Sequence, residues 1–506
     1  MLNRKKVIKK LLQSCNSTYG NRVINMVFTI SLLFLAAGCE TYTSSPQTNS
    51  TSHQSQNTGS RSELLNKLQQ SSKYRSEGDL EKSSAILEET DGMIDDFEKK
   101  ASTRLGQETL SAFTNPANIT YEGWSNERIM VDTYLALDSL MTGNPDRARV
   151  WLNKAYQRQR DAVERNSKVL ESAQSNVETS EITSYYEENL SKLTPLADYV
   201  NPFTSYLRGL FFMYYGEDNS DLETSRKALE QSYAFSKDNK CVKQDLELIE
   251  KMLNGKVALS NMTYVIFESG KGPYLAEKRI KLILNGEEAI PVFQNGDGQN
   301  NKLKVSSGDI NENSQIIANM DDIFGAAFGS ERKKIQARAG ASAGVKEATS
   351  SAAGTVAGIA ASQALSQVPG GGLFGSLVGG AIAGAATKAI VSEVQNTYNV
   401  ADTRSWTSLP ATFQICKIAT PKDKILQISE TNGNLKKTVE LPGGGINLVY
   451  VQTPPTGSVM NVWSVEMRER IDAELEEFEK YIEQKLKGKK SDPKDLFAVE
   501  SEDDSK

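Results

Sequence analysis

The chain has 506 residues, enough for more than one domain, and its 64 acidic residues outnumber its 58 basic ones. This balance argues against a general nucleic-acid binder, so no nucleic-acid partner is expected. The single histidine, His53, lies in a polar segment, which excludes a Ser-His-Asp triad, a Cys-His pair and a histidine-ligated zinc site from the folded body. We therefore predict no catalytic residue, no metal site and no cofactor, and expect that the protein is not an enzyme.

The first 38 residues have the order of a secretory signal peptide. The charged residues in this segment are all basic: Arg4, Lys5, Lys6, Lys9, Lys10 and Arg22. An apolar run over 26–36 follows, and small residues then lead into Cys39. The sequence "AAGC" resembles the lipobox of bacterial lipoproteins, although the preferred leucine, Leu35, lies one place early. That resemblance implies cleavage before Cys39 and acylation of this residue, for example with palmitate. The alternatives are an ordinary signal peptide or a short anchor helix.

Residues 39–60 are predicted to be a lipidated cysteine and a flexible tether. The segment after Cys39 is nearly all Ser, Thr, Gln and Asn, and it lacks the apolar pattern needed to bury a core. Glu40 stands where an aspartate, in Gram-negative lipoproteins, tends to signal retention at the inner membrane. The resemblance therefore implies a lipid anchor in the outer membrane, with the body facing the periplasm. Removal of the leader leaves 52 basic and 64 acidic residues, a formal charge of −12.

Residues 61–255 are predicted to be helical, because apolar residues recur at intervals of three and four. Three glycines with an Asp or Asn just after them, Gly78, Gly143 and Gly216, each separate two helical runs. These pairs resemble the tetratricopeptide (TPR) helix pair. The glycines are 65 and 73 residues apart, so the usual repeat period is not visible. The fold class expected is α+β, with a TPR-like helical domain first, and an unrelated helical bundle is the alternative.

Residues 256–460 are predicted to form a β-rich domain built from both sides of an insert. Short β-prone runs, separated by turn residues, are "MTYVIFES", "YLAEKRIKLIL", "AIPVF", "ATFQICKIA", "KILQISE", "KKTVELP" and "INLVYVQT". The first two are interpreted as strands around a Gly-Pro turn. Cys241 and Cys416 could form one disulfide in an oxidising compartment, or remain as two buried thiols.

The insert over 340–395 is rich in glycine and alanine and has no charged residue between Glu347 and Lys388. Its composition predicts a helical hairpin, because glycines spaced by four residues allow very close helix contact. We interpret it either as a packed or self-associating helix pair or as a hairpin that enters a membrane. The candidate helix-packing or self-association residues are Gly354, Gly358, Gly371, Gly375, Gly379, Gly380 and Gly384.

The last helix is predicted over 461–487, where Trp463, Met467 and Ile471 begin an apolar stripe with four-residue spacing. It is expected to dock on the body, and a partner-binding or self-pairing helix is the alternative. An acidic tail over 488–506 follows.

Several phrases together resemble a known family. They are "NERIMVDTYLALDSLMTGNPDRARVWLNKAYQRQRDAV", "NPFTSYLRGLFF", "YVIFESGKGPYLAEKRI" and "ADTRSWTSLPATFQI". They resemble an uncharacterised family of bacterial envelope lipoproteins with a TPR-like amino-terminal half, often encoded near lipoproteins that activate penicillin-binding proteins. The resemblance implies a role in the cell envelope, near cell-wall synthesis. It implies no known activity and therefore no catalytic positions.

These observations predict a lipid-anchored scaffold or adaptor that binds protein partners, with the cell-wall synthesis machinery as the implied partner and self-assembly as a further option. The array aromatics Tyr134, Trp151, Tyr206 and Tyr214 are candidates for partner contact, although aromatics at helical spacing more often lie in the core. Two other functions stay open: an oligomeric pore or export component that uses the glycine-rich hairpin, and a carboxylate-dependent envelope hydrolase.

Overall fold

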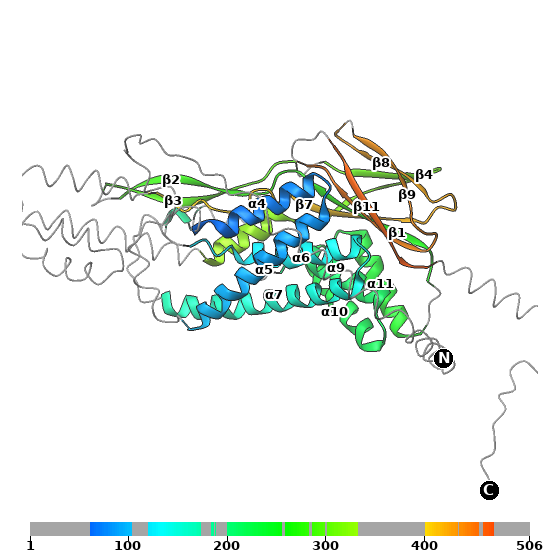
Figure 1. The fold of residues 1–506 in the computed structure, drawn as a ribbon, viewed down its shortest axis with the longest axis horizontal. Helices are drawn as coiled ribbons and strands as arrows, with labels where there is room; N and C mark the ends of the chain where they lie inside the picture. Colours follow the sequence, from blue (N-terminus) through cyan, green and yellow to red (C-terminus); the bar gives the residue numbers. More distant parts are fainter. Residues whose placement is uncertain are drawn as a thin grey trace, which may run out of the picture. The chain divides into compact units, whose positions relative to one another are not determined.

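The structure is a computed structural model, and the residues that it describes lie in one unit, Ser55–Lys506. The described ranges are 61–103, 120–173, 184–186, 188, 200–255, 259–282, 286–298, 301–331, 400–433, 435–454 and 459–469. Both helices and sheets are present, which confirms the predicted α+β class (Figure 1). In the part of the chain that the structure describes, no helix is both long enough and apolar enough to cross a membrane.

Helices fill the first half of the described chain and pack as hairpins. Their bounds are α4 Glu63–Ser76, α5 Leu80–Thr103, α6 Ser125–Met141, α7 Pro145–Ala173, α9 Pro202–Tyr215, α10 Asn219–Phe235 and α11 Lys240–Leu253. The pairs α4–α5, α6–α7 and α9–α10 lie in close contact. Each pair contains one of the three predicted glycine turns.

The three turns use glycine for two different reasons. Gly78 and Gly143 have φ values of +86° and +74°, a left-handed conformation that residues with a Cβ rarely adopt. Gly216 has an extended backbone, but a Cβ there would lie 2.3 Å from the carbonyl oxygen of Phe212. Asp218 then caps α10, because its side chain accepts a hydrogen bond from the backbone N–H of Asp221 at 2.9 Å.

A five-stranded sheet lies next to the helices, with the order β11-β10-β1-β7-β6. Its strands are β1 Met262–Ser269, β6 Gln315–Asn319, β7 Thr412–Ala419, β10 Ile446–Gln452 and β11 Asn461–Arg468. The β1–β10 pair is parallel and the other pairs are antiparallel. Strands from both sides of the segment over 332–399 therefore form one sheet.

Two smaller sheets complete the β structure. One has the order β5-β4-β8-β9 and the other is the β2–β3 pair. Their strands are β2 Tyr274–Leu282, β3 Gly286–Gln294, β4 Leu303–Ser307, β5 Ile310–Asn313, β8 Ile425–Glu430 and β9 Lys436–Glu440. The predicted strands on either side of the Gly-Pro turn, β1 and β2, both exist, but they belong to different sheets. A helix over 320–331 packs Phe324 and Phe328 against β2 and β3.

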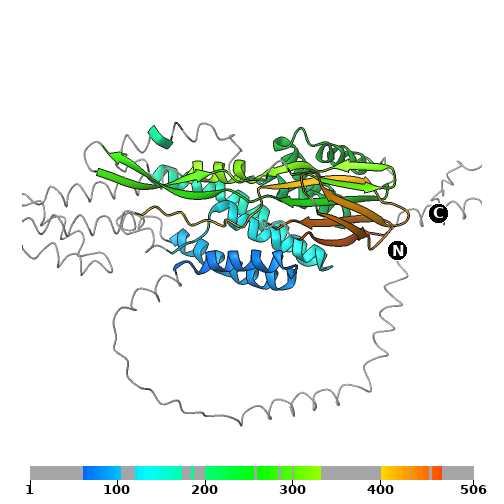
Figure 2. The ribbon, with the colours of Figure 1, turned by 90° about the horizontal axis from the view of Figure 1, so that it is seen from above.

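The five-stranded sheet is buried on both faces, as the side chains of β1 show. Tyr264 and Ile266 join the core shared with the helices, whereas Val265 and Phe267 join the core shared with the four-stranded sheet. The body therefore has three layers: helices, the five-stranded sheet and the four-stranded sheet (Figures 1 and 2).

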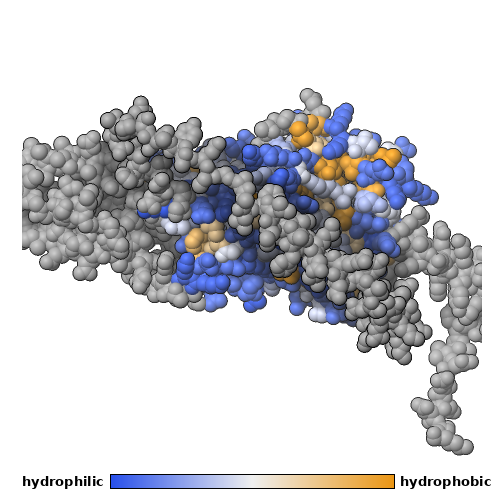
Figure 3. Space-filling view, in the orientation of Figure 1, coloured by the Kyte–Doolittle hydropathy of each residue, from blue (hydrophilic) through white to orange (hydrophobic). Residues whose placement is uncertain are grey.

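The outermost layer is the four-stranded sheet, which buries only one of its faces. In β8, Leu426 and Ile428 are buried, whereas Ile425 is 41% exposed. Figure 3 shows apolar side chains over this sheet and β11, among a mainly hydrophilic described surface.

One element is wrongly predicted. Residues 461–468 were expected to begin a helix, but they form β11 at the edge of the five-stranded sheet. Trp463 and Met467 are four residues apart, and positions i and i+4 share a face in a helix and in a strand alike. Val465 also packs against the helical core, which places 463, 465 and 467 on one face with the period of a strand. Residues 470–487 lie outside the described part of the chain.

Candidate partner-binding site

The sequence-predicted site residues fall into two groups. Cys39 and the glycines of the insert (Gly354, Gly358, Gly371, Gly375, Gly379, Gly380 and Gly384) lie outside the described residues. The array aromatics are described, and they are core residues. Tyr134, Tyr206 and Tyr214 are 3%, 0% and 7% exposed, and Trp151 is partly buried against the same cluster. None of the four is placed to make a large contact with a partner.

The two cysteines of the described body are both free and buried. Cys241 on α11 belongs to the core between helices and sheet, whereas Cys416 on β7 belongs to the core between the two sheets. Of the two possibilities that the sequence left open, the structure has the two buried thiols.

A hollow of about 350 Å³ lies between α7, α9 and α10. It is lined by Tyr156 from α7, Arg208 from α9 and four residues from α10: Thr224, Lys227, Ala228 and Gln231. The lining is mainly polar, and it includes two cationic side chains. No sequence motif distinguishes any of these residues, so they could not be predicted as a site.

Arg208 is fixed in the wall of the hollow by aromatic rings. Its guanidinium carbon lies 4.6 Å from the ring centre of Tyr156 and 4.9 Å from that of Phe212, and its Nη2 donates to Asn153 Oδ1 at 3.1 Å. Its Nε–H is buried and has no hydrogen-bond partner. Burial lowers the pKa of Arg208, and the nearby Tyr156 and Asp221 offset only part of that effect.

Neighbouring arginines have carboxylate partners that Arg208 lacks. Arg149 pairs with Asp221 at 2.8 Å, and Arg226 pairs with Glu223 at 2.9 Å and also with Glu230. Among the described carboxylates, none lies within 4.0 Å of the Arg208 guanidinium or of the Lys227 ammonium group. Arg208 is therefore a half-buried cation without an ion-pair partner in the described part of the chain, and the exposed Lys227 adds a second positive charge at the hollow.

A glycine places Arg208 beside α10. Gly209 follows Arg208, and a Cβ at this position would lie 2.6 Å from Leu229 Cγ. The Ser225 hydroxyl donates to the carbonyl oxygen of Gly209 at 2.7 Å, so side chains of α10 lie directly against the backbone of α9. Because α9 and α10 approach so closely, Arg208 on α9 and Lys227 on α10 can line the same space.

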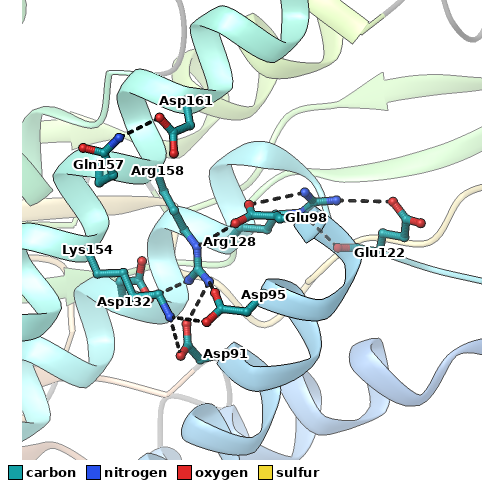
Figure 4. Close-up of polar contacts among 10 residues, drawn as sticks. All are labelled: Asp91, Asp95, Glu98, Glu122, Arg128, Asp132, Lys154, Gln157, Arg158 and Asp161. Atoms are coloured by element: carbon teal, nitrogen blue, oxygen red, sulfur yellow. Dashed lines mark hydrogen bonds and ion pairs between the residues drawn. The ribbon is translucent and has the colours of Figure 1, made fainter. Parts of the chain in front are cut away.

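A separate acid–base cluster joins α5, α6 and α7 (Figure 4). Arg158 pairs with Asp132 at 2.6 Å and with Asp91 and Asp95 at 2.8 Å each, and Lys154 pairs with the last two as well. Asp132 is fully buried and Arg158 is 3% exposed. Burial raises the pKa of the Asp132 carboxyl, and the charge of Arg158 opposes that rise.

This cluster bears on the hydrolase hypothesis, because that hypothesis requires carboxylates that converge in a cleft. The Asp91, Asp95 and Asp132 carboxylates do converge, but around two cations, and none of them lines the hollow described above. Within the described ranges, no group of three His, Cys, Asp or Glu side chains is arranged to hold a metal ion. The arrangement is that of a structural ion-pair network between three helices.

A second buried carboxylate, that of Glu127, joins chain segments that are far apart in the sequence. Glu127 accepts hydrogen bonds from the backbone N–H of Trp406 at 2.5 Å, from that of Trp124 at 2.9 Å, and from the Tyr121 hydroxyl. Burial raises the pKa of Glu127 to about 7, although the three donors oppose the rise. The cavity beside it is about 10 Å³, which is too small for a ligand larger than water.

Two further buried clusters tie the helices to the five-stranded sheet. Arg75 on α4 donates to Asp138 at 2.6 Å and to the Tyr450 hydroxyl of β10 at 3.3 Å. Asp245 on α11 accepts from Lys417 of β7 at 2.6 Å, and from two tyrosine hydroxyls, Tyr206 and Tyr264. Such ties hold the helical layer in one position on the sheet, so the hollow between α7, α9 and α10 is part of a fixed body.

No family model matches this chain, and searches of curated proteins and of solved structures also give no match. Function must therefore be argued from the residues themselves.

Proposed function

We propose that the protein is a lipid-anchored adaptor of the bacterial outer membrane that binds a protein partner in the periplasm through the hollow between α7, α9 and α10. The lipobox-like sequence that ends at Cys39 and the polar tether after it support the anchor. The three helix hairpins support the reading of a degenerate TPR-like array. The family resemblance supports a partner in the machinery of cell-wall synthesis.

The observation that carries the binding role is the hollow with the half-buried Arg208, which has no ion-pair partner among the described residues, and the exposed Lys227 beside it. Figure 1 shows α7 and α10 at the lower edge of the helical layer, on the side away from the labelled strands. For Arg208, which is half-buried, the absence of a paired anion within the described ranges is unfavourable in the isolated protein, and such a group often marks a binding site. An anionic group from a partner would remove that cost.

The central helix of the hollow, α9, is held against the five-stranded sheet before any partner arrives. Phe203 on α9 stacks on Phe413 of β7 with ring centres 4.1 Å apart, and Tyr214, also on α9, shares a hydrogen bond of 2.6 Å with Tyr264 of β1. Little conformational freedom is then lost on binding, which favours affinity.

The first test is crosslinking in living cells of a tagged, full-length protein, followed by mass spectrometry of the captured proteins. We expect the wild type to capture a protein of the cell envelope, and Cys39→Ala to capture at least about tenfold less, because the lipid raises the local concentration at the membrane. Both proteins must be present at equal amounts, as judged by the tag.

Two results would contradict the proposal. Equal capture by the wild type and Cys39→Ala would remove the role of the anchor. Capture of copies of this chain alone would favour the self-assembling pore or export component instead, and it would direct attention to the glycines of the insert.

A further inference from the structure

We propose that the hollow selects a carboxylate group, with Arg208 as the main binding residue and Lys227 as a second positive charge. This inference rests on the proposed function and specifies the chemistry of the partner: an acidic side chain or a carboxyl terminus of a peptide segment that enters the hollow between α7, α9 and α10.

The first argument is the orientation of Arg208. A guanidinium group offers its N–H donors in a planar fork that fits the two oxygens of a carboxylate. The rings of Tyr156 and Phe212 hold that plane, and a single hydrogen bond to Asn153 occupies Nη2. The Nη1 group keeps its donors, so a ligand in the hollow meets a fork that is already oriented.

The second argument is the set of donors around the fork. The Gln231 carbonyl oxygen accepts from the Ser205 hydroxyl at 3.1 Å, which leaves the amide N–H groups of Gln231 as donors toward the hollow. Thr224 supplies a hydroxyl and Lys227 an ammonium group. Because the described lining contains donors and positive charge, and no described carboxylate contributes to it, an anion fits better than a cation or a neutral acceptor-poor group.

The third argument separates an organic carboxylate from a bare inorganic anion. The hollow also presents the half-buried Tyr156 ring, which is an apolar surface next to the charged groups. Its volume of about 350 Å³ lies in the range of sites that bury small organic groups. A carboxylate on a short carbon chain can contact both the charged and polar groups and the Tyr156 ring, whereas phosphate contacts only the charged and polar groups.

The experiment measures binding of a labelled tetrapeptide, Ala-Ala-Ala-Glu with a free carboxyl terminus, to the full-length protein in detergent. The comparison peptide is Ala-Ala-Ala-Gln-amide, which lacks both carboxylates. We expect the acidic peptide to bind at least about tenfold more tightly than the neutral one, and we expect Arg208→Met to remove that preference. Arg208→Lys should retain part of the preference for the acidic peptide, because lysine keeps the positive charge but lacks the planar pair of guanidinium donors.

The matched control is Arg226→Met on α10. Arg226 lies near the hollow but already pairs with Glu223 and Glu230, so its loss should change acidic-peptide binding less than about twofold. Unchanged thermal unfolding of Arg208→Met shows that any loss of binding is local. Competition with sodium succinate and with sodium phosphate then shows whether the hollow prefers a carboxylate or phosphate.

Three outcomes overturn the inference: equal binding of the two peptides, full binding by Arg208→Met, or competition by phosphate at concentrations where succinate fails. The first two show that no carboxylate is recognised there, and the third shows a phosphate site. If the peptide measurements contradict the inference while partner capture in cells still depends on the hollow, the adaptor function stands and only its carboxylate chemistry is wrong. If capture is also independent of the hollow, both are wrong.

Discussion

Replacement of Arg158 by methionine is expected to lower the free energy of unfolding by about 3–5 kcal/mol. Arg158 is the cation shared by Asp91, Asp95 and Asp132, and the last of these is fully buried. Methionine fills similar space but leaves the Asp132 carboxylate in a low-dielectric interior without its partner. Lys154 bridges Asp91 and Asp95, and no ion pair joins it to Asp132, so its charge offsets only part of the loss.

Urea denaturation followed by circular dichroism measures this effect. The matched control is Arg147→Met in the same helix, because the Arg147 side chain is 44% exposed and pairs with Glu88 at the surface. That change should cost less than about 1 kcal/mol, since exposed ion pairs contribute little. Equal effects of the two substitutions would mean that the cluster between α5, α6 and α7 does not stabilise the fold as argued.

The protein is expected to lose about 2–3 kcal/mol of stability through Glu127 alone as the pH rises from 5 to 8. The folded-state pKa of this carboxyl is raised from 4.5 to about 7, because the side chain is buried. The folded protein therefore binds a proton more tightly than the unfolded chain does. Its contribution is fully present below the unfolded-state pKa, and it is lost as the pH rises through about 7.

The measurement compares the wild type with Glu127→Gln at pH 5 and pH 8. Other buried carboxyls contribute to both proteins: burial also raises the pKa of Asp138, to about 6, against the opposing charge of Arg75. Such contributions cancel in the difference between the two proteins, which isolates Glu127. The free energy of unfolding of the wild type minus that of Glu127→Gln should be about 2–3 kcal/mol smaller at pH 8 than at pH 5. Parallel pH profiles would contradict the assignment.

Local signals in the sequence were sufficient for the helix hairpins and most strands. A glycine that ends one helix and an Asp or Asn that begins the next act through neighbouring residues, so Gly78, Gly143 and Gly216 could be recognised without tertiary information. Runs of β-branched residues predicted β1, β7 and β10 for the same reason. The pairing of β1 with β10 and β7 could not be predicted, because it joins segments separated by the long insert.

The short strands β4, β5 and β6 were not predicted, and β5 shows most clearly why. Strand β5, "INEN", has four exposed residues and no alternation of apolar and polar positions. It forms because it pairs with β4, which in turn pairs with β8 more than a hundred residues later. Tertiary pairing, not local propensity, determines these strands.

The candidate site was invisible for a different reason. Arg208 matters because no described carboxylate lies within 4.0 Å of its guanidinium group, and a missing partner leaves no pattern in the sequence around "YLRGLFF". Likewise, Glu127 and Trp406 are joined by a hydrogen bond across 279 positions. The nearest available signal was Gly209, since glycine inside an apolar helix often marks close approach of another helix.

The most direct test of the adaptor account is site-specific photocrosslinking in cells. A photoreactive residue replaces Thr224, which lines the hollow, or Glu81, which is exposed on α5 and serves as the control position. The account predicts that one envelope protein crosslinks from position 224 and not from 81, and that Arg208→Met reduces this product at least about tenfold. The same product from both positions, or a product at position 224 that is unaffected by Arg208→Met, would contradict the claim that the hollow is where this protein binds its partner.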